Sequence, residues 1–413
     1  MGVLLLLLGF IVMPCDGRLW SGGMALWKEQ LQRQHQRHEE ALQKQEQQRL
    51  GVRHVHHFPT LNETLEMAEL SRLMYVLRGN QNCTTSHDMI PPQYECLLYK
   101  DDNQKEGSQV LVVSSEDKIV VAFAGTDNVR TSLDDADIIL KPLGPLDDKH
   151  KSILFPSAEG AKVHKGFDDS LFANGMYDSI LQVLYNATAA PTNTLPLYIT
   201  GHSLGAAESV LLGVAIMCEN ANTTNTTLSD TQQHPVGQRD RPVLLPTPRI
   251  INFGCPKLGN YNFHMALQET FPKLVSWRVV LGHDLVPRLP AYPFYHVGHT
   301  LQWSHKNVTD MTAYYQHRGN TTLGFAGVPL GWASFPFVWV PGAVSSHRML
   351  VYLQHLQQLY NMTQATGRNE EFIVREFEGI NNTPGGNDDD DLKVDDDDDG
   401  FWADDDVIHP KVE

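Results

Sequence analysis

The sequence has no surplus of basic residues. Its 413 residues contain 32 Lys and Arg against 49 Asp and Glu, which gives a formal net charge of −17. Most of this charge is local, because residues 388–413 hold twelve Asp, one Glu and two Lys, a net of −11, and leave only −6 for the rest. This balance argues against nucleic-acid binding. The acidic run is typical of a solvated, disordered tail.

Apolar runs long enough to cross a membrane are also lacking. The run Val3–Met13 has eleven residues, which is short for a bilayer and typical of a signal peptide. Small residues precede Arg18, so we predict a signal peptide over 1–17. The uncharged segment 321–346 is long enough, but its three Pro and four Gly argue against a spanning helix. It is either the wall of a pocket or a buried loop, and we expect no transmembrane segment in the mature chain.

Cysteines are few. Of the five, Cys15 would leave with the signal peptide, and four remain. An even number in an oxidising compartment indicates disulfides, and we prefer the pair Cys83–Cys96. The alternative for Cys218 and Cys255, which lie in apolar stretches, is that both are buried free thiols. Together with the signal peptide, nine Asn-X-Ser/Thr sequons favour a secreted or secretory-pathway glycoprotein. The sequons lie at Asn62, Asn82, Asn186, Asn222, Asn225, Asn307, Asn320, Asn361 and Asn381.

The remaining chain divides by composition into three parts. Residues 18–60 form a polar, Gln-rich extension without a heptad seam. Residues 61–365 alternate helical and strand patterns, and residues 366–413 form the acidic tail. The patterns predict helices over 64–76, 167–184, 204–217, 261–269 and 347–360, and strands over 110–114, 118–123, 195–200, 249–253 and 277–281. Such alternation predicts an α/β fold with a mostly parallel central sheet and helices on both faces.

The strongest chemical motif is Gly201-His202-Ser203-Leu204-Gly205. It is a G-x-S-x-G sequence with an apolar strand before it and a helix after it, which is the context of a nucleophile elbow. The Ser203 hydroxyl would project from the sheet edge. The N–H of Leu204 would lie at a helix N-terminus and could donate to an oxyanion. The alternative is a structural turn with an unreactive Ser.

A nucleophilic serine needs a base, and the base needs an orienting carboxylate. In hydrolase sheets the chain order is Ser, then acid, then His. Asp284 follows the strand predicted over 277–281, and the other carboxylate before Ser346 is Asp310, in a polar loop. His347 opens the last helix, although spacing alone does not single it out from the other histidines after Asp284, which are His296, His299, His305, His317, His355 and His409.

Several motifs occur in an order that resembles one family. They are the strand and turn Val120–Thr126, the H-x-G-F element Val163–Phe167, the elbow, the strand ending in F-G-x-P at Ile250–Pro256, the D-x-V-P-R-L-P segment Asp284–Pro290, and Tyr295–Gly298. Over roughly residues 61–362 the chain resembles the class 3 lipases, fungal-type triacylglycerol lipases of the α/β-hydrolase fold. His347 with Tyr352 is a looser match to the end of that pattern.

The resemblance implies a role for each matched residue. Ser203 would be the nucleophile, His347 the general base and acid, and Asp284 the group that orients His347. Thr126 and the N–H of Leu204 would form the oxyanion hole, and His164 would be structural. No cofactor and no metal are implied.

The chain departs from the family pattern in two places near the lid. Ala124 stands where the family usually has Arg, so an ion pair near the lid would be missing. The segment matching the fungal lid helix is Asn128–Asp137, which is polar; the alternative lid is the more apolar Ile138–Ala161.

The resulting interpretation is a serine esterase that acts on lipid carboxylic esters at a lipid–water interface, foremost a triacylglycerol lipase. On the same scaffold the alternatives are a phospholipase A1, a galactolipase or a feruloyl-type esterase. A non-catalytic glycoprotein that kept the fold is an alternative of a different class. An intact Ser, Asp and His in the expected order argues against it.

Overall fold

The computed structural model describes parts of the compact unit Met1–Glu378. The predicted signal peptide, residues 18–58 of the extension, the predicted lid Asn128–Asp137, most of 321–346 and most of the tail lie outside the described residues. The described residues are 59–79, 82–102, 108–126, 139–188, 195–230, 244–282, 284–290, 293–303, 311–314, 343–365 and 374–378.

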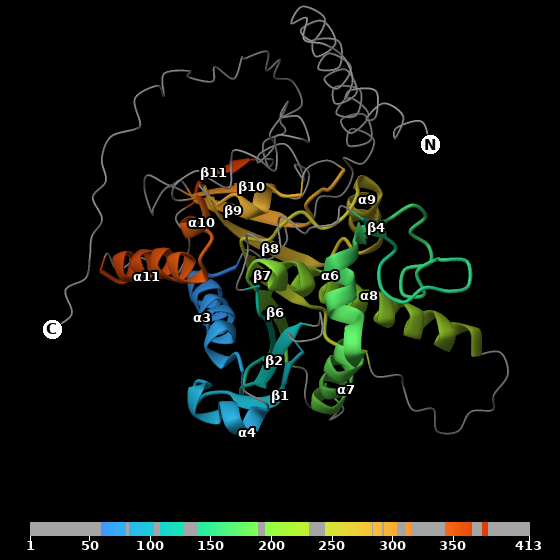
Figure 1. Cartoon of the computed structure of the whole chain (residues 1–413), viewed down its shortest axis with the longest axis horizontal. Coiled ribbons are helices and arrows are strands. Elements are labelled where there is room, and N and C mark those ends of the chain that lie inside the picture. The colour runs from blue at the N-terminus through green and yellow to red at the C-terminus, as the bar shows by residue number, and fades with distance from the viewer. Residues whose placement is uncertain are drawn as a thin grey trace, which may run out of the picture. The chain divides into compact units, whose positions relative to one another are not determined.

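A mixed sheet runs through the centre of the fold (Figure 1). Its strand order is β1-β2-β3-β6-β7-β8-β9-β10-β11. Neighbours from β3 to β9 are parallel, as are β10 and β11, while β1-β2-β3 and β9-β10 are antiparallel. The strands are β1 (Glu95–Asp101), β2 (Gln109–Ser114), β3 (Ile119–Phe123), β6 (Leu197–Gly201), β7 (Arg249–Phe253), β8 (Val275–Leu281), β9 (His299–Trp303), β10 (Met311–Tyr314) and β11 (Val374–Glu378), with β4 (Leu140–Lys141) and β5 (Val163–His164) in a separate pair.

The central strands are apolar on both faces, and their side chains alternate between two cores. In β3, Val121 and Phe123 join one core and Val120 and Ala122 the other. Successive strand residues point to opposite faces, so a strand covered on both sides reads as one continuous apolar run.

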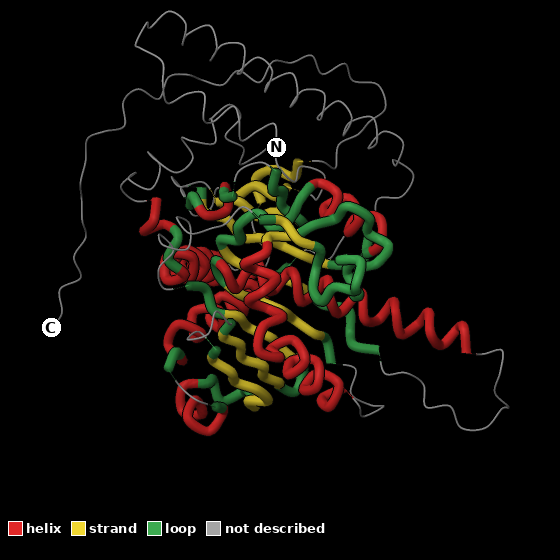
Figure 2. Tube along the Cα trace, turned by 45° about the vertical axis from the view of Figure 1, so that its right-hand side comes forward, coloured by secondary structure: helices red, strands yellow, loops and turns green. Residues whose placement is uncertain are grey.

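Helices cover each face and supply the rest of these cores. Helices α3 and α11 pack on one face, and α6, α7, α8 and α9 on the other (Figures 1 and 2). Helix α3 begins at a capping box, in which Thr60 and Glu63 bond each other's backbone N–H. The helices are α3 (Leu61–Leu77), α4 (Cys83–Ser86), α6 (Lys165–Phe172), α7 (Met176–Thr188), α8 (Leu204–Asp230), α9 (Tyr261–Thr270), α10 (Ala343–Ser346) and α11 (Met349–Ala365). The predicted α/β fold, with a mostly parallel sheet and helices on both faces, is confirmed.

Three local predictions need correction. The helix expected over 167–184 is two helices, because Asn174 and Gly175 take positive φ angles of 51° and 66° between α6 and α7. Helix α8 continues to Asp230. Strand β11 lies inside the residues predicted as a disordered tail and pairs with β10. Its sequence, Val-Arg-Glu-Phe-Glu, is rich in charge, as edge strands often are, so composition conceals it.

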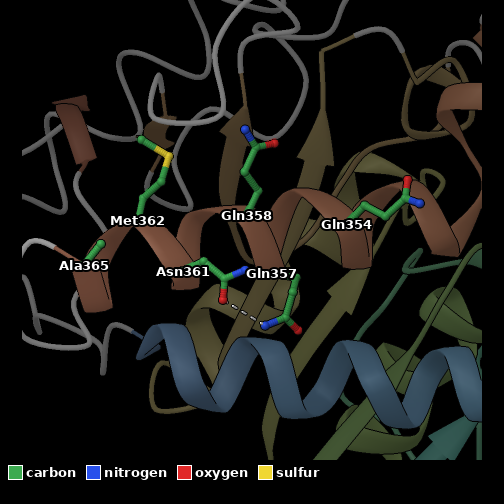
Figure 3. Close-up of a pocket in the computed structure, with 6 residues that line it drawn as sticks. All are labelled: Gln354, Gln357, Gln358, Asn361, Met362 and Ala365. Carbon is green, nitrogen blue, oxygen red and sulfur yellow. Dashed lines mark hydrogen bonds between the residues drawn. The ribbon is translucent and has the colours of Figure 1, made fainter. Parts of the chain in front are cut away.

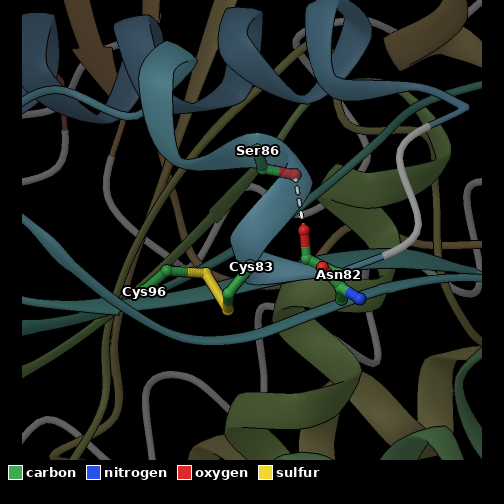
Figure 4. The surroundings of a disulfide bond; sticks show 4 residues. All are labelled: Asn82, Cys83, Ser86 and Cys96. Atoms are coloured by element: carbon green, nitrogen blue, oxygen red, sulfur yellow. Dashed lines mark hydrogen bonds between the residues drawn. A yellow bond between two sulfur atoms is a disulfide. The ribbon is translucent and has the colours of Figure 1, made fainter.

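A disulfide joins helix α4 to strand β1 (Figure 4). Cys83 and Cys96 are bonded with their Cα atoms 5.6 Å apart, which confirms the preferred pair. Beside the bridge, Ser86 donates from its N–H and its hydroxyl to the Asn82 carbonyl, and the sequon residue Asn82 is exposed. Cys218 and Cys255 are buried free thiols, as the alternative for this pair proposed.

Helix α8 is apolar over most of its length. Its segment Leu204–Thr224 is long and apolar enough to cross a membrane, but 72% of the apolar stretch within it is buried inside the fold. Helix α8 therefore has the burial of a core helix. Among the described residues no other helix reaches that length and hydropathy.

One carboxyl group is buried in α8, close to the elbow. Glu208 is fully buried and accepts hydrogen bonds from the hydroxyls of Ser108, at 2.5 Å, and Ser170. Burial raises the pKa of Glu208 to about 7, although the two hydroxyls act in the opposite direction. The native state therefore favours the neutral acid over a pH range in which the unfolded chain has already ionised.

We expect Glu208→Gln to stabilise the fold at pH 8 by about 2–3 kcal/mol and to change little near pH 4.5. With a raised folded-state pKa, the wild-type protein loses stability as pH rises from about 4.5 to about 7. The uncharged amide avoids this loss. Urea denaturation at pH 4.5, 6 and 8 measures the effect, with Glu219→Gln on the same helix as control. Parallel pH profiles for wild type and Glu208→Gln would contradict the expectation.

Candidate active site

Ser203 lies on a sharp turn between β6 and α8. Its φ angle is +60°, a left-handed value that is uncommon for residues other than glycine. A Cβ at Gly201 would lie 2.3 Å from the Gly205 carbonyl oxygen, and one at Gly205 would lie 2.6 Å from that of Phe123. Both glycines of the motif are therefore required by close backbone approach, and the geometry is that of a nucleophile elbow.

The elbow is fixed to the end of β7. The Ser203 N–H donates to the Phe253 carbonyl at 3.0 Å, and His202 forms a parallel bridge with Phe253. Leu204 is the first residue of α8, so its N–H has no acceptor within the helix. This N–H lies next to Ser203, at the position that the sequence analysis assigned to an oxyanion donor.

The turn after β3 packs directly against the elbow. A Cβ on Gly125 would meet the Ser203 Cβ at 3.0 Å and the His202 carbonyl oxygen at 2.6 Å. Thr126 follows Gly125 and is half-buried. The structure thus places the predicted oxyanion residues Thr126 and Leu204 on two segments that meet at Ser203.

Asp284 and His347 form a buried hydrogen-bonded pair. Their Oδ2 and Nδ1 atoms are 2.7 Å apart, and the residues are 0% and 2% exposed. Asp284 also accepts from the Tyr352 hydroxyl at 2.6 Å and from the Val286 N–H at 2.9 Å. Because a carboxylate only accepts, His347 carries its proton on Nδ1. In the described part of the structure, its Nε2 is buried and has no hydrogen-bond partner.

Gly254 brings this pair to the elbow. It directly follows Phe253, whose carbonyl holds the Ser203 N–H, and its φ angle is +59°. A Cβ at this position would lie 2.9 Å from His347 Cε1 and 3.0 Å from Asp284 Oδ2. The histidine ring and the carboxylate therefore pack on the backbone that supports Ser203.

His202 contributes a second imidazole. Its ring centroid is 4.5 Å from that of His347, and a hydrogen bond of 2.6 Å joins its Nδ1 to the Tyr75 hydroxyl. Burial, and then the neighbouring His347, lower the pKa of His202 well below its usual value. A neutral His202 does not repel a protonated His347.

A family model matches the part of the chain that carries the elbow and Asp284. The family model described as lipase (class 3) matches residues 120–294. These residues belong to the class 3 lipase family. This stretch, which we call the lipase segment, includes the elbow, Asp284 and the turn Ala124–Thr126, called here the oxyanion turn because it carries the predicted oxyanion residue Thr126; His347 lies beyond the segment.

Curated relatives of the lipase segment include two fungal proteins. The secreted mono- and diacylglycerol lipase MDL3 of Malassezia globosa is 29% identical over 238 residues, which is 57% of this chain and 66% of that protein. The lipase of Rhizomucor miehei is 26% identical over 223 residues, 52% of this chain and 49% of that one. Among solved structures, lipase II from Rhizopus niveus is 23% identical, covers 59% of this chain and 80% of that chain, and has a TM-score of 0.43. The chain thus spans 49% and 66% of the lengths of these two curated relatives.

Sequence reasoning missed two residues that support the oxyanion turn of the lipase segment. The Tyr75 hydroxyl packs against Gly125, since an added Cβ there would lie 2.2 Å from its oxygen, and Arg78 Nη2 donates to the Gly125 carbonyl at 2.7 Å. Both come from α3, and the Arg78 guanidinium stacks 5.6 Å from the Tyr75 ring. The sequence showed only that Ala124 lacks the family's Arg; nothing in it relates α3 to this turn.

The other histidines considered as bases have different surroundings. His296 and His355 each bond a backbone carbonyl, of Pro287 and Val351, and the His299 ring lies 4.6 Å from that of Trp277 at a tilt of 41°. The remaining three, like Asp310, lie outside the described residues, at His305, His317 and His409. Of the histidines that the structure describes, His347 is the one bonded to Asp284.

His164 has structural contacts. It caps α6, since its Nδ1 accepts from the Gly166 N–H at 3.2 Å, and its ring stacks 4.2 Å from Phe167. The alternative lid segment Ile138–Ala161 is partly described. There Ile139 and Ile153 are exposed, while Leu154 and Phe155 are buried.

A surface pocket of about 490 Å³ lies elsewhere, along α11 (Figure 3). It contains none of the candidate catalytic residues, and in Figure 3 a hydrogen bond joins Gln357 to the sequon residue Asn361. Its lining consists of Gln354, Gln357, Gln358, Asn361, Met362 and Ala365.

We expect Gly254→Ala to lower kcat at least 100-fold. The added methyl group would displace His347 and Asp284 by up to about an ångström, and misplacement of that size is enough to cost two orders of magnitude. Gly175→Ala is the matched control, because Gly175 has a similar φ of +66° but nothing within 4 Å of an added Cβ. It should lose stability and keep activity. Equal activity losses in the two variants would show that backbone strain, not crowding of the pair, is responsible.

Proposed function

We propose that the protein is a serine esterase that hydrolyses carboxylic esters of lipids. Ser203 is the nucleophile, His347 the general base and acid, and Asp284 the residue that orients the imidazole. The observation that carries this proposal is the buried Asp284–His347 pair, packed on Gly254 beside the strand end that holds Ser203. Acyl transfer by a serine needs a histidine that takes and returns a proton and a carboxylate that orients the histidine, and this pair supplies both.

In the proposed reaction the Ser203 oxygen attacks the ester carbonyl carbon while His347 Nε2 takes the hydroxyl proton. The oxyanion accepts hydrogen bonds from the N–H groups of Leu204 and Thr126. His347 then gives the proton to the departing alcohol, which leaves an acyl group on Ser203. Water, deprotonated by His347, releases the fatty acid. Asp284 stabilises the imidazolium formed in each half-reaction.

A fluorophosphonate probe tests the nucleophile directly. We expect stoichiometric labelling of folded protein, with the probe found by peptide mass spectrometry on Ser203 alone. Heat-denatured protein is the control, because an activated serine loses its reactivity with the fold. Absence of labelling, or labelling spread over several serines, would contradict the proposed nucleophile.

We propose acylglycerols as the substrate class. The support comes from relatives, which are named as mono- and diacylglycerol, or triacylglycerol, lipases. Initial rates on tri-, di- and monoacylglycerols of one acyl chain, against a matched phospholipid, galactolipid and feruloyl ester, test the assignment. Faster hydrolysis of any of the last three would replace the substrate class and leave the triad intact.

We also propose that the protein follows the secretory pathway. The support is the apolar N-terminal run, the Cys83–Cys96 disulfide and the exposed sequon residues Asn82, Asn186 and Asn361. Recovery from the medium of expressing cells, with a mass decrease after enzymatic removal of N-glycans, is the expected result. A protein retained in the cytosol without glycans would contradict it.

A further inference from the structure

Three buried basic side chains interact electrostatically inside the fold, and none of them belongs to the candidate triad. Lys257 follows β7, Arg278 lies within β8, and His296 precedes β9; they are 5%, 3% and 2% exposed. Arg278 points to the face opposite Trp277 and Val279, which belong to the core covered by α3 and α11. We call Lys257, Arg278 and His296 the basic cluster.

Arg278 has almost no partner for its charge. Its Nη2 donates to the Thr300 hydroxyl at 2.5 Å, whereas its Nε and Nη1 are buried and make no hydrogen bond in the described structure. Within the described residues, neither Arg278 nor Lys257 forms an ion pair. A buried guanidinium is normally paired with a carboxylate or a bound anion, because an unpaired buried charge is strongly unfavourable.

Arg278 does not lose its unpaired charge by releasing a proton. Burial lowers the pKa of Arg278 only to about 10, so it stays charged at neutral pH. Burial, and then the charge of Arg278, lower the pKa of Lys257 to about 8. Burial, and then the charges of Arg278 and Lys257, lower the pKa of His296 well below its usual value, so His296 is neutral. Its Nε2 donates to the Pro287 carbonyl at 2.6 Å. A fixed positive charge therefore remains in the interior.

We propose that the basic cluster binds a small monovalent anion of the size of chloride, held by one unpaired N–H of Arg278 and by the Lys257 ammonium. One such anion neutralises the fixed charge of Arg278. Its role is structural: it joins the segment after β7 to β8 and β9. The proposal is independent of ester hydrolysis, and its test uses stability.

The pairing of the sheet supplies a sharp test. Thr300 lies directly opposite Arg278 in the β8–β9 register and already contacts its guanidinium. Thr300→Glu would place a carboxylate of the chain against the Arg278 guanidinium and so neutralise the charge that the free anion balances, and Thr300→Gln is its uncharged control of equal size. Melting temperatures are measured in chloride from 1 to 300 mM, with gluconate, which is too large for a buried site, holding the ionic strength constant.

For wild type and Thr300→Gln we expect the melting temperature to rise by about 2–4 °C for each tenfold increase in chloride above Kd. Thr300→Glu should melt higher than Thr300→Gln at low chloride and show no chloride dependence. Crystals grown in bromide should give an anomalous peak in contact with Arg278 in the wild type. An equal chloride response in all three proteins, or a bromide crystal without that peak, would overturn the proposal; the crystal decides the matter if Thr300→Glu does not fold.

Discussion

Ser203→Ala is expected to lower kcat by about 10⁵- to 10⁶-fold with little change in stability. Removal of the hydroxyl eliminates the atom that forms the acyl bond in the proposed reaction. Without that atom, His347 and Asp284 also no longer contribute to catalysis, because the three residues act as one unit. Alanine tolerates the φ of +60° no better and no worse than serine. The backbone hydrogen bonds of the elbow also remain, so folding should be preserved.

The measurement is single-turnover and steady-state hydrolysis of a soluble short-chain ester, with the thermal melt as a check on folding. Ser209→Ala is the matched control. Ser209 is also buried in α8, and its hydroxyl bonds the Ala206 carbonyl at 2.7 Å, outside the proposed chemistry. It should keep activity within tenfold of wild type. Activity of Ser203→Ala close to that of wild type would rule out the proposed nucleophile.

Asp284→Asn is expected to lower kcat by about 10⁴-fold. Asp284 accepts from His347, Tyr352 and Val286, and an amide cannot accept at its nitrogen. If the amide nitrogen faces His347, it donates to Nδ1 and forces the ring proton onto Nε2, the atom that must accept from Ser203. The substitution therefore favours the wrong tautomer and also removes the charge that stabilises the imidazolium.

Tyr352→Phe separates the effect of one hydrogen bond to Asp284 from the effect of the carboxylate charge and the His347 tautomer. It removes one hydrogen bond to Asp284 and leaves the carboxylate and the His347 tautomer in place. We expect a loss of about tenfold, with KM for a soluble ester nearly unchanged. Comparison of kcat for the two variants at pH 8 makes the distinction. A kcat for Asp284→Asn within tenfold of wild type would remove Asp284 from the mechanism.

The sequence predicted the strands at the centre of the sheet better than those further out. Strands β3, β6 and β7 were predicted because burial on both faces makes them apolar throughout. Strands β1, β9 and β11 were missed. They carry polar or charged side chains, such as Glu95, Lys100 and Gln302, so their patterns resemble those of loops. Backbone pairing with a neighbour, which the sequence does not display, defines them.

The same division applies to the candidate site. The elbow was predictable, because only glycine fits where a Cβ would approach a backbone oxygen to 2.6 Å or less. From the sequence alone, short motifs predicted Ser203 and Asp284, and the resemblance to a family pattern predicted His347 after them. Spacing could not select His347 from the other histidines, since that choice depends on where the turn between α10 and α11 places the ring.

Only the tertiary structure decided which distant groups meet. It brought Tyr75 and Arg78 from α3 to the oxyanion turn, and it placed Arg278 in the interior without a carboxylate. These contacts join residues on separate elements, so no local pattern encodes them. Sequence fixes short-range geometry through sterics and periodicity; the packing of helices on the two sheet faces determines which side chains share a buried site.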